Sequence, residues 1–477
     1  MSRLTLTKEV RQDLNAIIAE PKGRRVGVLG LGVIGTAMAR HLAERGAEVV
    51  AADLRADLAA DELRDLGVEL RLGAMQADCF DDVEAVAIGP GADPRQAAAT
   101  RVLKSGRPLF GELELAGNLS VPFVGITGTN GKSTTTALLG ALLQAAGRDP
   151  FVGGNLGDSL LVWLDSKIPR DTAVVELSSF QLETAYSLRA DVGIMLNVTP
   201  DHFERYDDVL SYADVKQRLV ENADVAVLNH DDPIVVAMAN HTSGRVVWFS
   251  TVENSVPGDG LALGAGDRVV GCGQVSYLDG FDLAHPRLFG PHNRENALAA
   301  LCAAHALGAL AGQEQSVRRG YVEFSGLANR LEWVGEWNGV TFINDSKATN
   351  DESARVAVAA MDKPVILLAG GRDKGTGYAR LATAVGKNVK AVLAYGEAKE
   401  AVAAALSDHG RIERLASMRA AFARAVALCE RGDVVLLAPA CSSFDEFDNY
   451  VARGQVFRDL FGELENSGAS AAEERQL

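Results

Sequence analysis

The chain has 477 residues, of which 47% are hydrophobic, and its formal net charge at pH 7 is -16. This length exceeds what one hydrophobic core fills, and about 150 residues per domain predicts roughly three domains. The acidic charge argues against a nucleic-acid-binding surface, because such surfaces neutralise phosphates with Lys and Arg.

The cysteines and the apolar segments indicate in which cellular compartment the protein is expected. The five cysteines are scattered and form no CxxC pair, so neither a disulfide framework nor a zinc site is indicated. Residues 1–14 lack the apolar core of a signal peptide, and the longest apolar stretch, 297–311, is too short to span a bilayer. We expect a cytoplasmic protein without membrane insertion.

Three series of strand-like and helix-like segments follow one another along the chain. Short β-branched runs alternate with helical patterns from residue 24 to residue 117, a second series starts at residue 121, and a third begins after Gly326. This alternation is typical of βαβ units on parallel sheets. The sequence therefore predicts an α/β protein with domains at 1–118, 119–325 and 326–477.

The first series opens with a glycine motif. Gly30, Gly32 and Gly35 form GxGxxG after the run RVGVL, and Asp53 ends the next run, where a dinucleotide-binding fold places its ribose-binding acid. Taken alone, this pattern favours NAD, with a structural tight turn as the alternative. The motif requires only that a diphosphate lie on a helix N-terminus, so a nucleoside diphosphate sugar fits as well.

The second series opens with GITGTNGKSTTTALLG, which has the form of a phosphate loop between a strand and a helix. Its spacing departs from GxxxxGK[ST], and a glycine-rich turn is the alternative. Glycines tolerate unusual backbone angles, a lysine reaches terminal phosphates and a hydroxyl holds Mg²⁺. We expect the loop to bind ATP through Gly128, Thr129, Asn130, Gly131, Lys132, Ser133 and Thr134.

Five further polar residues of this series are candidate site residues, and each also has an ordinary structural explanation. Glu176 ends a strand-like run, where an acid can orient Mg²⁺ but is also often solvated. His202 ends another run and is either a ligand or a structural histidine, while Lys216 has the pattern of a surface lysine. Asn293 and Asn296 lie three apart at a helix start, where both amides can face one ligand or simply cap the helix.

The third series places polar groups after its strands. NDSKATN (344–350) follows the run VTFI and contains an acid, an amine and a hydroxyl, which suit either a solvated turn or a substrate site. Lys374 and Ser443 follow two further runs. The carboxyl ends of parallel strands are where α/β sheets bind ligands.

The segments GTNGKST, ELSSFQLE, NVTPDH, GPHNRENA and NDSKATN occur in this order, and with them the chain resembles the Mur ligases of peptidoglycan synthesis. NDSKATN with ELSSFQLE resembles the members that join D-glutamate to UDP-N-acetylmuramoyl-L-alanine. The resemblance implies an ATP-dependent amide ligase that acts through an acyl phosphate. It implies a Rossmann-like N-terminal domain for the UDP-sugar, a central P-loop ATPase-type domain for ATP and a Rossmann-like C-terminal domain for the amino acid and part of the nucleotide.

The resemblance replaces NAD by a UDP-sugar and assigns roles residue by residue. Lys132 would neutralise the γ-phosphate, Ser133 and Glu176 would hold one Mg²⁺, and His202 and Lys216 would hold a second. In the family that lysine is carbamylated, which turns an amine that would repel metal into an oxygen ligand. Whether Lys216 carries this group stays open here, and we expect a monomer.

The remaining implied contacts fall into three sets. The implied UDP-sugar contacts are Gly32, Val33, Ile34, Asp53, Arg55, Gly91, Asn155 and His202. The further implied ATP contacts are Asn293, Asn296, Arg330 and Asp345. The implied D-glutamate contacts are Lys347, Thr349, Lys374, Ser443 and Tyr450. The chain departs from the family at Asn329, where a histidine is frequent, and at Tyr450, where phenylalanine is common.

Overall fold

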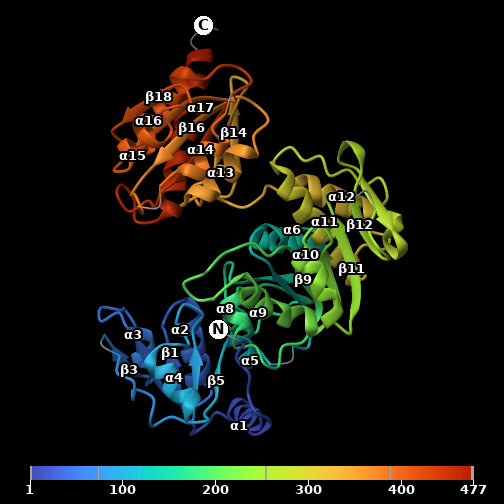
Figure 1. Ribbon diagram of the computed structural model, residues 1–477, viewed down its shortest axis with the longest axis vertical. Helices are drawn as coiled ribbons and strands as arrows, with labels where there is room; N and C mark the ends of the chain where they lie inside the picture. Colours follow the sequence, from blue (N-terminus) through green and yellow to red (C-terminus); the bar gives the residue numbers. More distant parts are fainter. Residues whose placement is uncertain are drawn as a thin grey trace. The chain divides into compact units, whose positions relative to one another are not determined.

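The computed structural model describes residues 3–473 except 74, 118, 253, 254, 376 and 387, with side chains up to residue 466. It contains three sheets, each flanked by helices (Figure 1). The chain divides into two compact units, Met1–Ala284 with Arg294–Tyr321, and His285–Asn293 with Val322–Leu477. None of the helices in these described ranges has both the length and the apolar character needed to cross a membrane.

The first sheet is parallel throughout, in the order β3-β2-β1-β4-β5. Its strands are β1 (Arg25–Leu29), β2 (Glu48–Asp53), β3 (Glu69–Leu72), β4 (Ala85–Ile88) and β5 (Leu109–Phe110). Its helices are α1 (Lys8–Ala19), α2 (Val33–Glu44), α3 (Asp61–Asp65), α4 (Ala97–Lys104) and α5 (Glu112–Ala116). The order reverses between β1 and β4, so the loops after these two strands flank the crevice where such sheets bind ligands.

The second sheet has the order β13-β12-β11-β10-β9-β6-β8-β7 and is parallel except for β12 and β13. Its strands are β6 (Phe123–Thr127), β7 (Pro150–Gly154), β8 (Thr172–Glu176), β9 (Ala190–Met195), β10 (Ala223–Asn229), β11 (Arg245–Ser250), β12 (Gly260–Leu263) and β13 (Val269–Cys272). Because β6 pairs with both β8 and β9, the loops after these three strands lie side by side.

Both α-helices and short 3-10 helices accompany this second sheet. The helices are α6 (Lys132–Ala145), α7 (Leu160–Ser166), α8 (Ser179–Leu182), α9 (Val209–Glu221), α10 (Pro233–Met238), α11 (Pro291–Ala306) and α12 (Glu314–Glu323), with 3-10 turns η1 (Ala239–His241), η2 (Ala265–Asp267) and η3 (Gly273–Leu278). Apolar residues of α9, such as Val215 and Leu219, join those of β8 and β9 in one buried cluster. This packing fixes the register of α9, the helix that carries Lys216.

The third sheet, in the C-terminal unit, has the order β14-β15-β19-β16-β17-β18, with β14 antiparallel to β15 and the rest parallel. Its strands are β14 (Glu332–Trp337), β15 (Val340–Asn344), β16 (Val365–Gly370), β17 (Val389–Tyr395), β18 (Ile412–Leu415) and β19 (Val434–Ala440). Its helices are α13 (Asp351–Ala359), α14 (Ala379–Ala384), α15 (Lys399–Ala405), α16 (Met418–Leu428) and α17 (Tyr450–Glu473). The central strands are apolar and buried on both faces, as parallel strands between helices require.

Candidate active site

The loop between β6 and α6 has the backbone of a phosphate loop. Gly128 and Gly131 have φ angles of 153° and 86°, which side-chain-bearing residues rarely adopt. A Cβ atom on Gly131 would lie 2.2 Å from the Oδ1 atom of Asn296. The Asn197 carbonyl accepts from the N–H of Thr129 at 2.9 Å, and its side-chain oxygen accepts from the N–H of Asn130 at 2.8 Å. The loop thus presents the N-terminus of α6, where Lys132 begins the helix, a geometry suited to anions.

Two lysines converge on this loop. The Lys132 amine donates to the carbonyls of Gly128 and Thr129 at 2.9 and 2.8 Å. The Lys216 amine donates to the same Gly128 carbonyl at 2.8 Å and to the hydroxyl of Thr127 at 3.2 Å. Lys216 is 1% exposed, and desolvation, followed by the charge of Lys132, places its pKa well below the ordinary lysine value. The alternative of a surface lysine at 216 is therefore wrong.

Glu176, at the end of β8, is buried beside the loop. It is 3% exposed, so the alternative of a solvated carboxylate is wrong. One of its carboxylate oxygens accepts from the Asn155 amide at 2.9 Å. The other is buried without a hydrogen-bond partner among the described residues. Because an unpaired buried carboxylate oxygen is costly, this atom marks a place for a cation.

The donor set fits Mg²⁺ with phosphates as co-ligands. Among the described residues, no three His, Cys, Asp or Glu side chains cluster closely enough to hold a metal by themselves. Mg²⁺ usually takes one or two carboxylates and completes its shell with phosphate and water oxygens. Glu176 supplies a carboxylate oxygen, and Ser133 is a buried hydroxyl in the first turn of α6.

A cavity of about 840 Å³ lies at the reversal point of the first sheet. The residues predicted to contact the UDP-sugar that line it are Gly32, Val33, Ile34, Asp53, Arg55, Gly91 and Asn155. Helix α2 begins there behind Gly32, which gives it no side-chain cap, so its first N–H groups suit a diphosphate. Asn155 both lines this cavity and donates to Glu176, so the cavity adjoins the phosphate-loop site.

Asp53 holds Arg55 over this cavity. The two carboxylate oxygens accept from the Arg55 guanidinium at 2.9 Å, and one of them also accepts from the N–H of Leu31 at 2.7 Å. The hydrogen bonds from Arg55 hold the pKa of Asp53 far below its usual value. Asp53 therefore orients the Arg55 guanidinium at the cavity wall, and its contact with a ribose stays a prediction.

His202 lies on a turn after β9, apart from the residues that line the cavity. Its backbone φ is 55°, its Nδ1 atom lies 3.1 Å from a carboxylate oxygen of Glu204, and its ring centroid is 4.8 Å from that of Phe180. Tyr212 stands between it and Lys216, with 6.1 Å between the His202 and Tyr212 ring centroids and 4.7 Å from the Lys216 amine to the Tyr212 ring. His202 is not among the described residues that line the cavity.

The two predicted asparagines have different surroundings. Asn296 is 2% exposed, and its Oδ1 atom accepts from the hydroxyl of Thr135 at 3.2 Å, directly behind the phosphate loop. The Asn293 amide donates to the carbonyl of Phe289 at 2.8 Å within the C-terminal unit. Asn296 thus braces the loop, and its amide is a wall of the space above Gly131.

The predicted residues of the C-terminal unit follow several of its strands: Asp345, Lys347 and Thr349 come after β15, Lys374 after β16 and Ser443 after β19. Burial raises the pKa of Asp345 to about 7, against the opposing charge of Arg330. The Lys347 amine lies 5.3 Å from the centre of the Tyr450 ring. Ser443 is 2% exposed, Thr349 is partly buried, and Lys374 is exposed. The loop after β15 buries Ser346 and Ala348, so it is more than a solvated turn, and it places an acid and an amine two residues apart.

Comparisons with known proteins cover most of the chain. Three family models match: a Mur ligase MurD-like N-terminal domain at 24–111, the Mur ligase middle domain at 126–304 and the Mur ligase glutamate ligase domain at 329–441. The UDP-N-acetylmuramoylalanine--D-glutamate ligase of Anaeromyxobacter dehalogenans is 43% identical over 459 residues, covering 92% of this chain and 98% of that protein. The chain belongs to the Mur ligase family.

Two further comparisons support membership of this family and its fold. The UDP-N-acetylmuramoylalanine--D-glutamate ligase of Chromobacterium violaceum is 40% identical over 450 residues, with 91% of this chain and 97% of that protein covered. Among solved structures, the UDP-N-acetylmuramate-alanine ligase of Thermotoga maritima matches with a TM-score of 0.57 at 18% identity, covering 92% of this chain and 99% of that one. The latter likeness supports the three-domain α/β Mur ligase fold.

One residue of this Mur ligase that the sequence analysis missed is Arg453 in α17. It is fully buried, and its guanidinium donates to the hydroxyl of Ser346 at 3.0 Å, the carbonyl of Ser346 at 2.8 Å, and the carbonyls of Cys441 and Ser442 at 3.1 and 3.3 Å. It therefore ties the loop after β15 to the loop after β19. An arginine within a helix gives no local signal of this role.

Proposed function

We propose that this Mur ligase joins D-glutamate to UDP-N-acetylmuramoyl-L-alanine with ATP, releasing ADP and phosphate, in peptidoglycan precursor synthesis. The observation that carries the proposal is the meeting of two sites at Asn155, which lines the cavity of the first sheet and bonds to Glu176 beside the phosphate loop. A UDP-sugar in the cavity would extend its carboxylate toward the terminal phosphate of ATP. The names of the two relatives point to the same reaction.

We assign residues 1–118 to the UDP-sugar, 119–325 to ATP, and 326–477 to the amino acid and part of the nucleotide. The assignment follows the three sheets, because each presents its predicted site residues at the carboxyl ends of its strands. We place the reaction in the cytoplasm and propose that the chain acts as a monomer. Light scattering of the purified protein tests the last point.

In the first chemical step, the L-alanine carboxylate would attack the γ-phosphorus of ATP to give an acyl phosphate and ADP. Two anions must approach, so positive charge at the site is the main requirement. Lys132 would move from the loop carbonyls, which it contacts at 2.8–2.9 Å, to the γ-phosphate oxygens. Mg²⁺, when bound, offsets phosphate charge; Ser133 and Glu176 would hold one ion, and His202 and a carbamylated Lys216 would hold a second.

In the second step, the amine of D-glutamate would attack the acyl carbon and release phosphate. Lys347, Thr349, Lys374, Ser443 and Tyr450 are our proposed contacts for this amino acid. Their amines and hydroxyls match two carboxylates in chemistry. Asp345, whose pKa burial raises to about 7, and Arg330 would belong to the nucleotide site.

Phosphate release separates this function from its alternatives. The purified chain is given ATP, Mg²⁺ and UDP-N-acetylmuramoyl-L-alanine with D-glutamate, L-glutamate, L-lysine or meso-diaminopimelate in turn. We expect release with D-glutamate alone. A preference for another amino acid would point to a different member of the family, and binding without release would indicate a sensor.

A further inference from the structure

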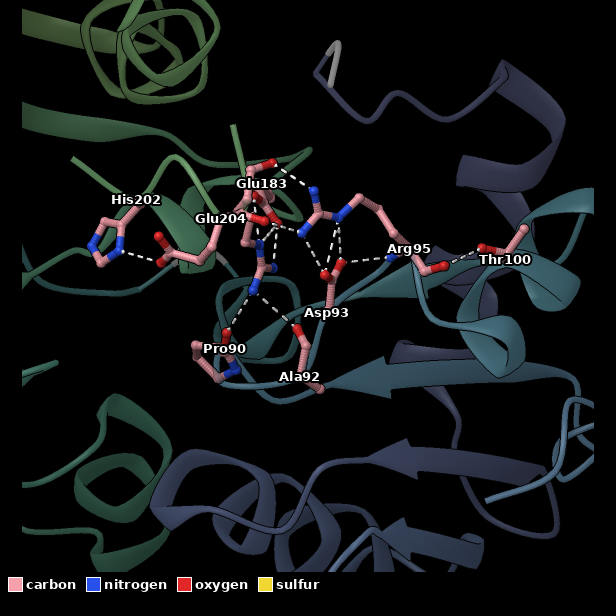
Figure 2. Close-up of polar contacts among 9 residues, drawn as sticks. Pro90, Ala92, Asp93, Arg95, Thr100, Glu183, His202 and Glu204 are labelled. Atoms are coloured by element: carbon pink, nitrogen blue, oxygen red, sulfur yellow. Dashed lines mark hydrogen bonds and ion pairs between the residues drawn. The ribbon is translucent and has the colours of Figure 1, made fainter. Parts of the chain in front are cut away.

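A polar network fastens the loop after β4 to the turn that carries His202 (Figure 2). The loop supplies Pro90, Gly91, Ala92 and Asp93 to the wall of the 840 Å³ cavity. The turn, residues 202–205, lies between β9 of the second sheet and α9. These segments are more than a hundred residues apart in sequence, so their contact is a feature of the fold.

Arg205 is the centre of this network. Its guanidinium donates to the carbonyls of Pro90 and Ala92 at 3.2 and 3.1 Å, one on each side of Gly91. Its Nε atom donates to both carboxylate oxygens of Glu183 at 3.0 and 3.1 Å, and its Nη2 atom makes a further bond to the same carboxylate. The carbon of its guanidinium lies 4.1 Å from the centre of the Phe180 ring.

Burial makes this arrangement rigid. The Arg205 and Glu183 side chains are only 7% and 5% exposed. A bidentate guanidinium–carboxylate pair has one favourable geometry, and away from water it is weakly screened. Glu183 therefore aims the remaining N–H groups of Arg205 at the two loop carbonyls.

A second arginine fastens the same segments in the opposite direction. Arg95, beyond the cavity loop, donates to the carbonyls of Glu204 and Arg205 at 2.7 and 3.2 Å, and it is paired with Asp93 (Figure 2). The N–H of Arg205 in turn donates to the His202 carbonyl at 2.9 Å. Each segment thus offers its carbonyls to an arginine of the other.

We propose that Arg205, aimed by Glu183, is a positioning residue that sets the UDP-sugar cavity at the correct distance from the His202 turn and the phosphate loop. The inference rests on the proposed function. A substrate held at its UDP end and reacting at its far carboxylate is sensitive to this distance, since a misplacement of about 1 Å can lower a rate roughly 10²-fold. Arg205 touches neither reacting atom.

The test uses the double variant Glu183→Gln/Arg205→Gln in the full chain. Removing Arg205 alone would leave a buried carboxylate unpaired and endanger folding, whereas two amides keep the pair neutral. Arg205→Lys keeps the charge but loses the planar fork. Arg107→Gln is the matched control, because Arg107 also holds two carbonyls, those of Phe80 and Val83, and none of these three is a described residue of the cavity wall.

We expect the double variant to raise the KM for UDP-N-acetylmuramoyl-L-alanine about 10-fold or more and to lower kcat about 10-fold or more, with the KM for ATP within about 2-fold of the wild type. Arg205→Lys should fall between, and Arg107→Gln should match the wild type. A merely structural role would reduce the active fraction and leave both KM values unchanged.

An unchanged KM for the UDP-sugar in a folded double variant overturns the inference. Calorimetric titration with UDP gives a second readout that needs no turnover, and we expect weaker binding by the double variant only. Failure of the proposed function shows instead as a wild type that releases no phosphate.

Discussion

Burial changes the acid–base chemistry of the Lys216 amine. The side chain is 1% exposed and lies close to Lys132, and burial places the pKa of its amine well below the ordinary lysine value, a shift that favours the neutral, nucleophilic form. A neutral amine is the form that attacks CO₂. Carbon-13 NMR after labelling with bicarbonate should show a carbamate carbon that disappears in Lys216→Arg, and an identical signal in that variant would contradict the assignment.

The same burial makes Lys216 a cost to stability. Its folded pKa lies below its unfolded pKa, so the unfolded chain binds more protons, and the cost grows as the pH falls below the unfolded value. In buffer free of bicarbonate, where Lys216 stays a free amine, we expect Lys216→Met to raise the free energy of unfolding by roughly 1–2 kcal/mol near neutral pH, while abolishing ligase activity. Urea denaturation at about pH 6 and about pH 9 should show the larger gain at the lower pH. The exposed Lys8→Met is the control, and a gain that increased with pH would refute this reasoning.

At the scale of an element, the loop before α6 requires glycine at position 131 for two reasons, a close neighbouring atom and a positive φ. Gly131→Ala would place a methyl group 2.2 Å from the Asn296 oxygen at a φ of 86°. We expect a loss of roughly 1–2 kcal/mol from the backbone strain and a KM for ATP raised about 10-fold or more by displacement of the loop. Gly147→Ala, at a φ of 83° with nothing within 4 Å, carries similar strain without the clash and should leave the KM for ATP unchanged. Equal KM values for ATP in the two variants would contradict a role of this loop in binding ATP.

Helix α17 provides the corresponding element of the C-terminal unit. Arg453→Met would leave the carbonyls of Ser346, Cys441 and Ser442 without this donor and should lower stability by roughly 3 kcal/mol. Because it frees the loops after β15 and β19, we expect the KM for D-glutamate to rise while the KM for the UDP-sugar stays constant. Arg419→Met, at an exposed arginine of α16, is the control. Stability curves and steady-state kinetics would show whether the two effects occur together.

Local patterns foretold the elements better than the contacts between them. The GTNGK segment predicted a strand, a loop and a helix, and the structure has β6 ending at Thr127 and α6 beginning at Lys132. The sequence of α9 could not predict the burial of Lys216, because the residues that contact its amine, Thr127 and Gly128, lie about ninety residues earlier in the chain. Asn329 has a φ of 63°, a backbone conformation that asparagine adopts more readily than most residues, and no local sequence pattern indicated this turn. Arg205 and Arg453 act on carbonyls more than ten residues away in sequence, which no spacing rule detects.

At the scale of the whole molecule, the three sheets repeat one arrangement. Each presents a loop after one of its inner strands: Gly30–Gly35 after β1, the GTNGK loop after β6 and the NDSKATN loop after β15. Parallel strands converge their carboxyl ends, so each sheet gathers polar groups at one edge while the rest stays apolar. The proposed reaction has three substrates, and the proposed assignment gives one of them to each sheet.

This division of labour implies that catalysis depends on all three substrates together. An acyl phosphate hydrolyses in water, so an enzyme that formed it without the attacking amine would waste ATP; a site that excludes water until all substrates are present avoids this loss. We expect phosphate release without D-glutamate to be below roughly a tenth of the complete rate. The measurement compares ATP alone, ATP with UDP-N-acetylmuramoyl-L-alanine, and the full set, with Lys132→Ala as the blank. Equal rates in the last two conditions would mean that the intermediate is not protected, and would separate ATP cleavage from amide formation.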